Sequence, residues 1–368
     1  MEGVRMKVGI VGMPGAGKTA VFRLLTGGGP GGRQDASIGM ARVPDARIDV
    51  LSGMFKPRKT TYAQIEVVDL AGGASVGLAR GGDSDARAKA RGISLLINHM
   101  RTVDAFIHVV RAFDSPDGEP AKALADAASL GEELILADMA IAEARVERLQ
   151  SSRKRTPEED HELELMDLLA RELGEGRGLR QMELTAEDQD CLRGYGLLSV
   201  KPVVLVANMS EEQYQSGGYP EQAQLRAYCD ELHTPLVGLA AGIEADISEL
   251  PQDERKAFMD AYGIVSTGVE QVSRAVYESL GLVSFFTVGE DEVRAWPIAS
   301  GTRAKQAAGK IHSDIEHGFI RAEIVSYDGL IRLGSYAAVR TAGAFRLEGR
   351  DYIMADGDIV NFRFSPPR

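Results

Sequence analysis

One glycine-rich stretch near the N-terminus constrains the fold more than any other part of this sequence. A short apolar run at residues 6–11 leads into Gly12-Met13-Pro14-Gly15-Ala16-Gly17-Lys18-Thr19, which has the spacing G-x-x-x-x-G-K-[ST]. Glycines let successive backbone N–H groups converge on an anion, and a helix that starts near Lys18 adds its partial positive end. The pattern predicts a strand, a phosphate-binding loop and a helix that open an α/β P-loop NTPase domain.

The residue types in this loop predict a nucleoside triphosphate bound with Mg²⁺. Lys18 would reach the β- and γ-phosphates, and the Thr19 hydroxyl would bind the metal. A chance match of a glycine-rich turn is the alternative, but a strand before the loop and a helix after it favour phosphate binding. The candidate nucleotide-binding residues here are Gly12, Pro14, Gly15, Ala16, Gly17, Lys18, Thr19 and Ala20.

A second apolar run, residues 63–69, ends in the sequence Asp69-Leu70-Ala71-Gly72. An acid at the end of a strand, followed by x-x-Gly, is the Walker B arrangement. In it, Asp69 would join Thr19 in holding the Mg²⁺ ion, and the Gly72 N–H would meet the γ-phosphate. Lys18, Asp69 and Gly72 are therefore the candidate catalytic residues.

Base recognition is predicted at the end of a further apolar strand, residues 203–207. Asn208-Met209-Ser210-Glu211 stands where P-loop GTPases have N-K-x-D, whose Asp grips guanine. Asn208 would brace the loop, but Glu211 is one methylene longer than Asp and would not make the same bidentate contact. Ala241 lies in the loop expected over the base. The motif argues against selectivity for guanine and leaves ATP and GTP both open.

Composition narrows the classes of function. The chain has 368 residues and 44% apolar content, which predicts two or three domains with real cores. It has no run of about 18 apolar residues, so no membrane span is expected. Cys191 and Cys229 are the only cysteines, which favours a reducing cytoplasm. A net charge of −12 argues against a DNA partner, and any RNA contact would use a local patch.

Residues 121–195 differ from the rest of the chain in amino-acid composition. Their Ala-, Leu- and Glu-rich helical spacing breaks at 151–157, which predicts an inserted hairpin of two antiparallel helices. Thr156 is a candidate N-cap for the second helix, with Pro157 at its first position. The hairpin is either an arm that binds a partner or a stabilising element without one.

The C-terminal third predicts a change of fold class. Residues 244–281 predict two helices that complete the α/β domain. From residue 285, short β-runs with turns, among them 319–324 and 352–354, indicate a small α+β module. Upstream, His108 lies inside an apolar run and is predicted to be a packed core histidine rather than a ligand.

Taken together, these motifs resemble one family, the YchF/Obg-like ATPases of the translation-factor-related (TRAFAC) class of P-loop GTPases. The resemblance covers essentially the whole chain. It is most specific in Asn208-x-x-Glu211, in the helical insertion, and in C-terminal segments such as Glu292-Val293-Arg294-Ala295-Trp296 and His317-Gly318-Phe319-Ile320-Arg321-Ala322-Glu323. It implies a P-loop G domain at 1–120 and 200–284, a helical coiled-coil arm at 121–199, and a TGS domain of ubiquitin-like β-grasp fold at 285–368.

The resemblance also implies an activity and partners. It implies that ATP binds at least as well as GTP, that hydrolysis is slow and requires Mg²⁺, and that the protein associates with ribosomes or ribosomal RNA through the TGS domain and the arm. Carried over by position, Asn208 and Glu211 would bind the base, with Met209 against its face and Ala241 over it.

Several positions depart from the family pattern. Asn usually stands at Gly15, where in related GTPases it helps to bind an activating K⁺, so K⁺ dependence stays open here. The threonine-containing switch I segment is reduced to Gln34-Asp35-Ala36-Ser37, and Gly73 replaces a larger apolar residue. A histidine that the family carries after the strand at 104–110 has no counterpart in 113–130. These departures indicate a divergent paralogue whose nucleotide binding is better supported than its turnover.

The leading hypothesis is a slow Mg²⁺-dependent ATPase, with GTP left open as a second substrate, whose nucleotide state governs its association with the ribosome. One alternative is a nucleotide-sensing binding module with little or no hydrolysis. The other is a regulatory GTPase that prefers guanine.

Overall fold

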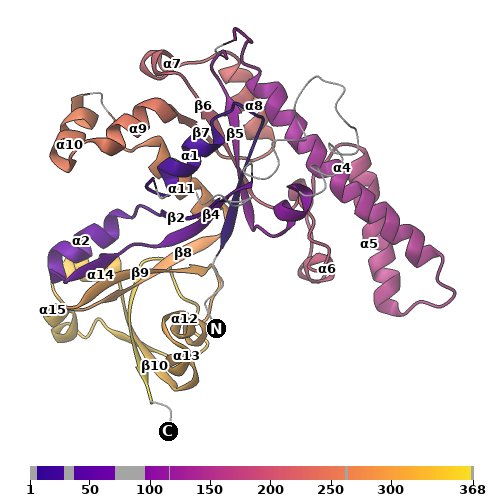
Figure 1. Ribbon diagram of the computed structural model, residues 1–368. Coiled ribbons are helices and arrows are strands. Elements are labelled where there is room, and N and C mark those ends of the chain that lie inside the picture. The colour runs from indigo at the N-terminus through magenta and orange to yellow at the C-terminus, as the bar shows by residue number, and fades with distance from the viewer. Residues whose placement is uncertain (1–5, 29–36, 71–95, 116, 262–263, 366–368) are drawn as a thin grey trace. The chain divides into compact units, whose positions relative to one another are not determined.

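The computed structural model describes residues 6–28, 37–70, 96–115, 117–261 and 264–365 (Figure 1). The chain divides into two compact units. We call residues 7–39 and 67–272 the P-loop unit, and residues 1–6, 40–66 and 273–368 the C-terminal unit. In the described ranges, no helix combines the length and the apolarity that a bilayer crossing needs.

A six-stranded sheet organises the P-loop unit, in the strand order β2-β4-β1-β5-β6-β7. The pairs β1–β5, β5–β6 and β6–β7 are parallel. Strands of a parallel sheet are covered on both faces, which explains why β6 is buried at every residue. The α/β fold that the sequence predicted is confirmed. The strands are β1 (Lys7–Val11), β2 (Ser37–Arg42), β4 (Gln64–Asp69), β5 (Ala105–Arg111), β6 (Val203–Asn208) and β7 (Leu236–Leu239).

The helices of this unit follow or connect the strands, and one prediction about them was wrong. Three helices, not two, occupy the region predicted at 244–281, because Leu250 before Pro251 takes an extended conformation that ends the first of them. The helices are α1 (Lys18–Leu25), α4 (Ala123–Gln150), α5 (Pro157–Gly174), the 3₁₀ turn η2 (Leu179–Gln181), α6 (Ala186–Leu192), α7 (Glu211–Ser216), α8 (Gln222–Glu231), α9 (Ala241–Glu249), α10 (Gln252–Ala261) and α11 (Gly268–Ser279).

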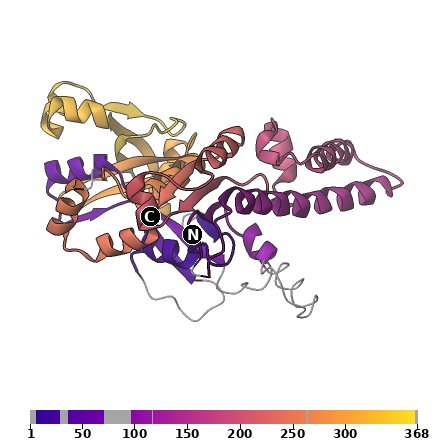
Figure 2. The ribbon, with the colours of Figure 1, turned by 90° about the horizontal axis from the view of Figure 1, so that it is seen from above.

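Helices α4 and α5 form the predicted hairpin, and they lie side by side in both views (Figures 1 and 2). Thr156 and Glu159 make the reciprocal hydrogen bonds of a capping box, and Pro157 is the first residue of α5. Met166 and Leu169 are fully buried in the core of the hairpin. The predicted helix start is therefore confirmed to the residue.

Asp138 fixes the middle of α4 to the chain that leads back into the sheet. Its carboxylate is fully buried and accepts the backbone N–H groups of Leu198, at 2.9 Å, and Ser199, at 2.7 Å. Burial raises the pKa of Asp138, and these hydrogen bonds oppose that shift. The arm is thus anchored by a buried carboxylate, whose hydrogen bonds could not be replaced by bulk water if they were lost.

The C-terminal unit contains a second six-stranded sheet, in the order β11-β10-β12-β8-β9-β3. Phe285 and Ile324 lie in its buried core together with Ala304 and Ala308 of α12. Its strands are β3 (Lys59–Thr61), β8 (Leu282–Val288), β9 (Glu292–Ala299), β10 (Phe319–Ser326), β11 (Arg346–Glu348) and β12 (Asp358–Phe364). Its helices are α2 (Ala46–Phe55), α12 (Ala304–Ile311), α13 (Ser313–His317), α14 (Tyr327–Leu333) and α15 (Tyr336–Thr341).

Two features of this unit differ from the sequence analysis. The β-run predicted at 352–354 is not a strand: Ile353 makes one isolated bridge with Arg303, and the Tyr352 carbonyl accepts the Ala304 N–H at 2.7 Å. Residues 40–66 group with the C-terminal sheet, which the sequence did not indicate. The predicted boundaries of G domain, arm and TGS domain stay a prediction.

Replacing Asp138 with Ala should lower the free energy of unfolding by about 2–4 kcal/mol, because two buried N–H groups lose a charged acceptor. Urea unfolding followed by circular dichroism measures the change. Asp167→Ala in α5 is the matched control: its ion pair with Arg171 is exposed and 3.6 Å long, so its loss should cost roughly 0.5 kcal/mol or less. Equal losses in the two variants would contradict the anchoring role.

A second prediction concerns pH. Glu244 of α9 is buried and accepts the N–H groups of Gly268 and Val269 at the start of α11. Burial raises the pKa of this carboxyl to about 7, although the two hydrogen bonds act in the opposite direction. Because the folded pKa exceeds the unfolded one, the contribution of Glu244 to stability is present at low pH and is lost as the pH rises through 7.

Between pH 5 and pH 8 the native protein should lose about 2 kcal/mol of unfolding free energy through this group. Denaturant titrations of wild type and Glu244→Gln at both pH values isolate the effect, since the variant cannot titrate there. Glu249→Gln, on the exposed side of α9, should keep the wild-type dependence. An unchanged pH profile in Glu244→Gln would rule out the assignment.

Candidate functional site

The glycines of the loop after β1 adopt conformations that other residues rarely take. Gly12, Gly15 and Gly17 have φ values of 143°, 79° and 95°. A Cβ atom on Gly12 would lie 2.1 Å from the carbonyl oxygen of Val109, and one on Gly17 would lie 2.2 Å from Nδ2 of Asn208. The loop therefore passes so close to β5 and to the end of β6 that only glycine fits at these two positions.

Lys18, the first residue of α1, is held by the loop that precedes it. Its Nζ donates to the carbonyl oxygens of Gly12, at 3.0 Å, and Met13, at 2.8 Å. Burial lowers the pKa of Lys18, and the negative charge of Asp69 acts against that shift. An ammonium group has three N–H donors, so the two loop contacts orient the charge and leave a donor for an anion in the loop.

Thr19 and Asp69 meet at the edge of this loop. The Thr19 hydroxyl donates to Oδ2 of Asp69 at 3.2 Å, and Asp69 is buried at the last position of β4. A hydroxyl and a carboxylate at this spacing suit Mg²⁺, which takes one or two protein oxygens and completes its shell with water and phosphate. Within the described ranges, no group of three His, Cys, Asp or Glu side chains could hold a metal alone. A Mg²⁺ ion held by Thr19 and Asp69 would take its remaining ligands from water or phosphate.

The side-chain amide of Asn208 joins the phosphate loop to the start of α9. Its Nδ2 donates to the Ala16 carbonyl at 2.9 Å, and its Oδ1 accepts the Ala241 N–H at 3.2 Å. Only 4% of the residue is exposed. Both ends of the amide are occupied, so Asn208 braces the two loops as the sequence suggested. The sequence could not show the contact with Ala241, because it uses a backbone N–H.

Glu211 and Met209 lie beside this brace. Glu211 is the exposed first residue of α7, where its carboxylate accepts a hydrogen bond from Gln215 at 3.2 Å. Met209 is half-buried, and Gly238 leaves room for its methyl group, since a Cβ there would lie 2.9 Å from Met209 Cε. The contact of Met209 with a base face stays a prediction.

The remaining predicted residues divide into three groups. Ala16 is fully buried under the loop, whereas Pro14 and Ala20 are exposed on it. His108 is buried as predicted; burial, together with the charges of Lys18 and Arg180, lowers its pKa to about 3, so it is neutral at ordinary pH. The candidates Gly72 and Gly73 and the segment 34–36 lie outside the described residues.

Comparison with known proteins agrees with this geometry. A family described as "50S ribosome-binding GTPase" matches residues 7–137. The YchF-GTPase_C family, described as a protein of unknown function (DUF933), matches residues 282–365. The chain therefore consists of a P-loop GTPase domain and a YchF-type C-terminal domain.

Relatives extend the match over the whole length. The "Ribosome-binding ATPase YchF" of Bacillus subtilis is 36% identical over 98% of this chain and 99% of its own. The protein of the same name from Escherichia coli O157:H7 is 34% identical over the same shares, and "Obg-like ATPase 1" of rice (Oryza sativa subsp. japonica) is 32% identical over 98% of this chain and 92% of its own. A solved structure, the YchF GTPase of Schizosaccharomyces pombe, covers 99% of both chains at a TM-score of 0.85 and 28% identity. With a similarity that runs from end to end, the chain belongs to the YchF family.

Proposed function

We propose that this protein is a nucleoside triphosphatase that binds ATP with Mg²⁺, hydrolyses it slowly, and associates with the ribosome according to its nucleotide state. The observation that carries the proposal is the position of Lys18. Its ammonium is fixed by two loop carbonyls, next to the Thr19–Asp69 pair. These contacts place a positive charge beside a hydroxyl and a carboxylate, which is the donor set that a phosphate chain with Mg²⁺ requires.

The loop residues would then divide the work as follows. The Lys18 ammonium and the backbone N–H groups of the loop from Gly12 to Ala20, Pro14 excepted, would offset the charge of the phosphates. Thr19 and Asp69 would hold Mg²⁺, which would supply further positive charge there. The rate of hydrolysis would come from positioning and electrostatic stabilisation. The catalytic groups in this proposal are Lys18, Asp69 and the N–H of Gly72. The proposal does not include K⁺ dependence, because Gly15 carries no side chain to help bind that ion.

Two features support adenine at least as well as guanine. Asn208 uses one amide N–H on Ala16 and one lone pair on Ala241, so its main contacts brace the two loops rather than select a base. Glu211 is exposed at the start of α7 and carries the longer carboxylate in place of the aspartate that would grip guanine. We therefore assign the base site to Asn208, Met209 and Glu211, with Ala241 over the base.

The ribosome enters the proposal because the relatives from Bacillus subtilis and Escherichia coli are named ribosome-binding ATPases. The arm and the C-terminal unit are the surfaces that we propose for this contact with ribosomal RNA or protein. Arg153 and Lys154 are exposed at the tip of the arm. In the C-terminal unit, Lys305 is exposed on α12. A cytoplasmic location belongs to the same proposal, and both cysteines are free thiols.

Replacing Lys18 with Ala should lower ATP turnover by about 100-fold or more, because the charge that faces the β- and γ-phosphates is lost. Phosphate release by the purified full-length protein, with and without ribosomes, is the measurement. Arg226→Ala, on the exposed face of α8, is the control and should keep turnover under both conditions. Unchanged turnover in Lys18→Ala would refute the assignment, and tight ATP binding without phosphate release in wild type would favour a binding module.

Competition between ATP and GTP for one site tests the base assignment. Wild type should bind ATP at least as tightly as GTP. Glu211→Asp should shift the preference toward GTP by roughly tenfold, because the shorter carboxylate can make the bidentate contact with guanine. Glu212→Asp, the exposed neighbour on the same helix, should shift nothing. A strong preference of wild type for GTP would contradict the interpretation that Glu211 does not select guanine, and it would favour a guanine-specific switch.

A further inference from the structure

The segment from residue 40 to 66 folds into the C-terminal unit, although it comes between two parts of the P-loop unit along the chain. Its helix α2 buries Ile48 and Leu51 completely. Its strand β3 pairs in parallel with β9, from Lys59 opposite Glu292 to Thr61 opposite Arg294. The segment thus supplies a helix and an edge strand to the C-terminal sheet.

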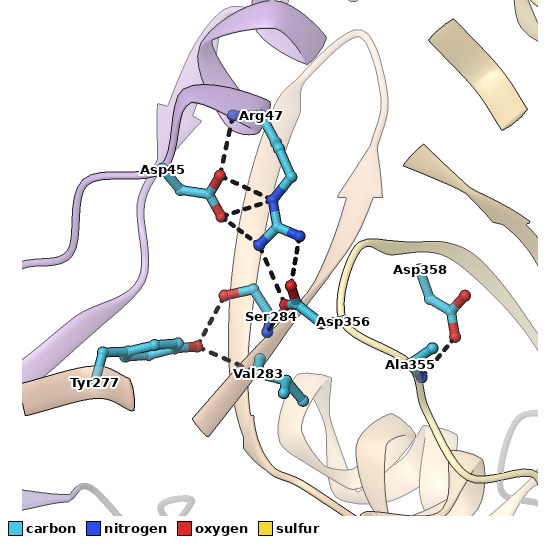
Figure 3. A network of polar contacts seen from close by, with 8 residues as sticks. All are labelled: Asp45, Arg47, Tyr277, Val283, Ser284, Ala355, Asp356 and Asp358. Atoms are coloured by element: carbon cyan, nitrogen blue, oxygen red, sulfur yellow. Dashed lines mark hydrogen bonds and ion pairs between the residues drawn. The ribbon is translucent and has the colours of Figure 1, made fainter. Parts of the chain in front are cut away.

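Arg47 is the centre of the polar contacts that hold this segment in place (Figure 3). On one side its Nε and Nη2 donate to the two carboxylate oxygens of Asp45, at 2.9 and 2.8 Å. On the other side its Nη1 and Nη2 donate to the oxygens of Asp356, at 2.7 and 3.1 Å. One guanidinium therefore joins the start of α2 to the turn before β12 with two forked contacts.

The turn that carries Asp356 is itself fixed. Asp356 Oδ1 accepts the Ser284 N–H at 2.9 Å, and the Ser284 hydroxyl lies 2.8 Å from the hydroxyl of Tyr277 (Figure 3). Asp358, which is 1% exposed, accepts the Ala355 N–H at 2.9 Å. Asp356 can therefore not follow Arg47 freely, and a displacement of α2 would be passed to β8 and β12.

The environment makes this contact stronger than an ordinary surface ion pair. Arg47 is 29% exposed and lies 5.2 Å above the ring of Phe286. Burial opposes its charge, but the hydrogen bonds and charges of Asp45 and Asp356 outweigh that effect and raise the pKa of Arg47. Arg58 and Asp291 join the same two parts of the chain at 3.2 Å, yet both are 86% exposed, and such a pair contributes little.

The strands at the two ends of the segment, β2 and β4, belong to the sheet of the P-loop unit. Before it, Gly39 of β2 packs on α1 so closely that a Cβ there would lie 2.4 Å from the Thr26 methyl group. After it, β4 continues from Gln64 to Asp69, whose carboxylate meets the hydroxyl of Thr19. The segment is therefore preceded by a strand that packs on the C-terminal end of α1 and followed by a strand that ends at the proposed metal ligand.

We propose that Arg47 couples residues 40–66 to the C-terminal domain, so that changes at β2 and β4 on nucleotide binding are carried into residues 282–365. The proposal rests on the ATP binding proposed above and assigns the regulation of that site. A forked contact with fixed partners transmits a displacement, whereas an exposed single contact yields to it. Arg47 is a positioning residue in this scheme and touches no nucleotide.

Hydrogen exchange of the full-length protein, read by mass spectrometry, tests the coupling. Amide exchange in residues 282–365 is compared without nucleotide, with ATP–Mg²⁺ and with ADP–Mg²⁺, for wild type, Arg47→Ala, Asp356→Asn and the exposed control Arg58→Ala. Wild type and Arg58→Ala should show a nucleotide-dependent difference in this region. Arg47→Ala should reduce that difference by about fivefold or more, while the Kd for ATP changes by about twofold or less.

Asp356→Asn keeps the size of the side chain and removes its charge, so it reports on the coupling if Arg47→Ala fails to fold. A full nucleotide-dependent difference in the folded Arg47 or Asp356 variants would overturn the proposal. Absence of any difference in wild type that binds ATP would also overturn it and would leave the proposed ATP binding intact. Failure of wild type to bind ATP would instead refute the proposed function, and the coupling with it.

Discussion

The nucleotide site depends on one buried side-chain amide. Asn208 sits at the carboxyl end of β6, donates to Ala16 in the phosphate loop and accepts from Ala241 at the start of α9. Because Gly17 has no Cβ, the amide can approach the loop at a distance that any other residue would block. Two loops that are far apart in the sequence thereby share one rigid support. The left-handed glycines and the orientation of Lys18 persist because the loop cannot relax away from this support.

Buried carboxylates serve the same purpose elsewhere in the P-loop unit. Asp138 and Glu244 each accept hydrogen bonds from backbone N–H groups, of a turn in one case and of a helix start in the other. These N–H groups would otherwise lack partners in the interior. Each carboxylate takes the place of water as the hydrogen-bond acceptor. The segments between the strands can therefore be buried against the sheet. The arm and the helices after β7 are therefore each held by one buried carboxylate with at least two hydrogen bonds, as well as by apolar packing.

The parts of the site that the sequence predicted are those whose geometry is local. The strand, the turn and the helix start follow one another between Lys7 and Thr19, so spacing alone predicted that Lys18 opens the helix after the loop. Thr156 and Glu159 are likewise three residues apart, and the capping box was predictable. The contact of Asn208 with Ala241 and the pairing of Lys59 with Glu292 were not, because each joins distant residues through backbone groups. The short strand Lys59–Thr61 carries no apolar alternation that could have revealed it.

The pairing of β3 with β9 also bears on how this family can change during evolution. The family match at residues 282–365 covers a region that lacks α2 and β3, which come from residues 46–61. A gene fusion that transferred only the C-terminal region would leave one edge of its sheet unpaired and would expose the surface that Ile48 and Leu51 cover. In this chain the C-terminal sheet is therefore complete only together with residues 46–61, which lie outside the matched region.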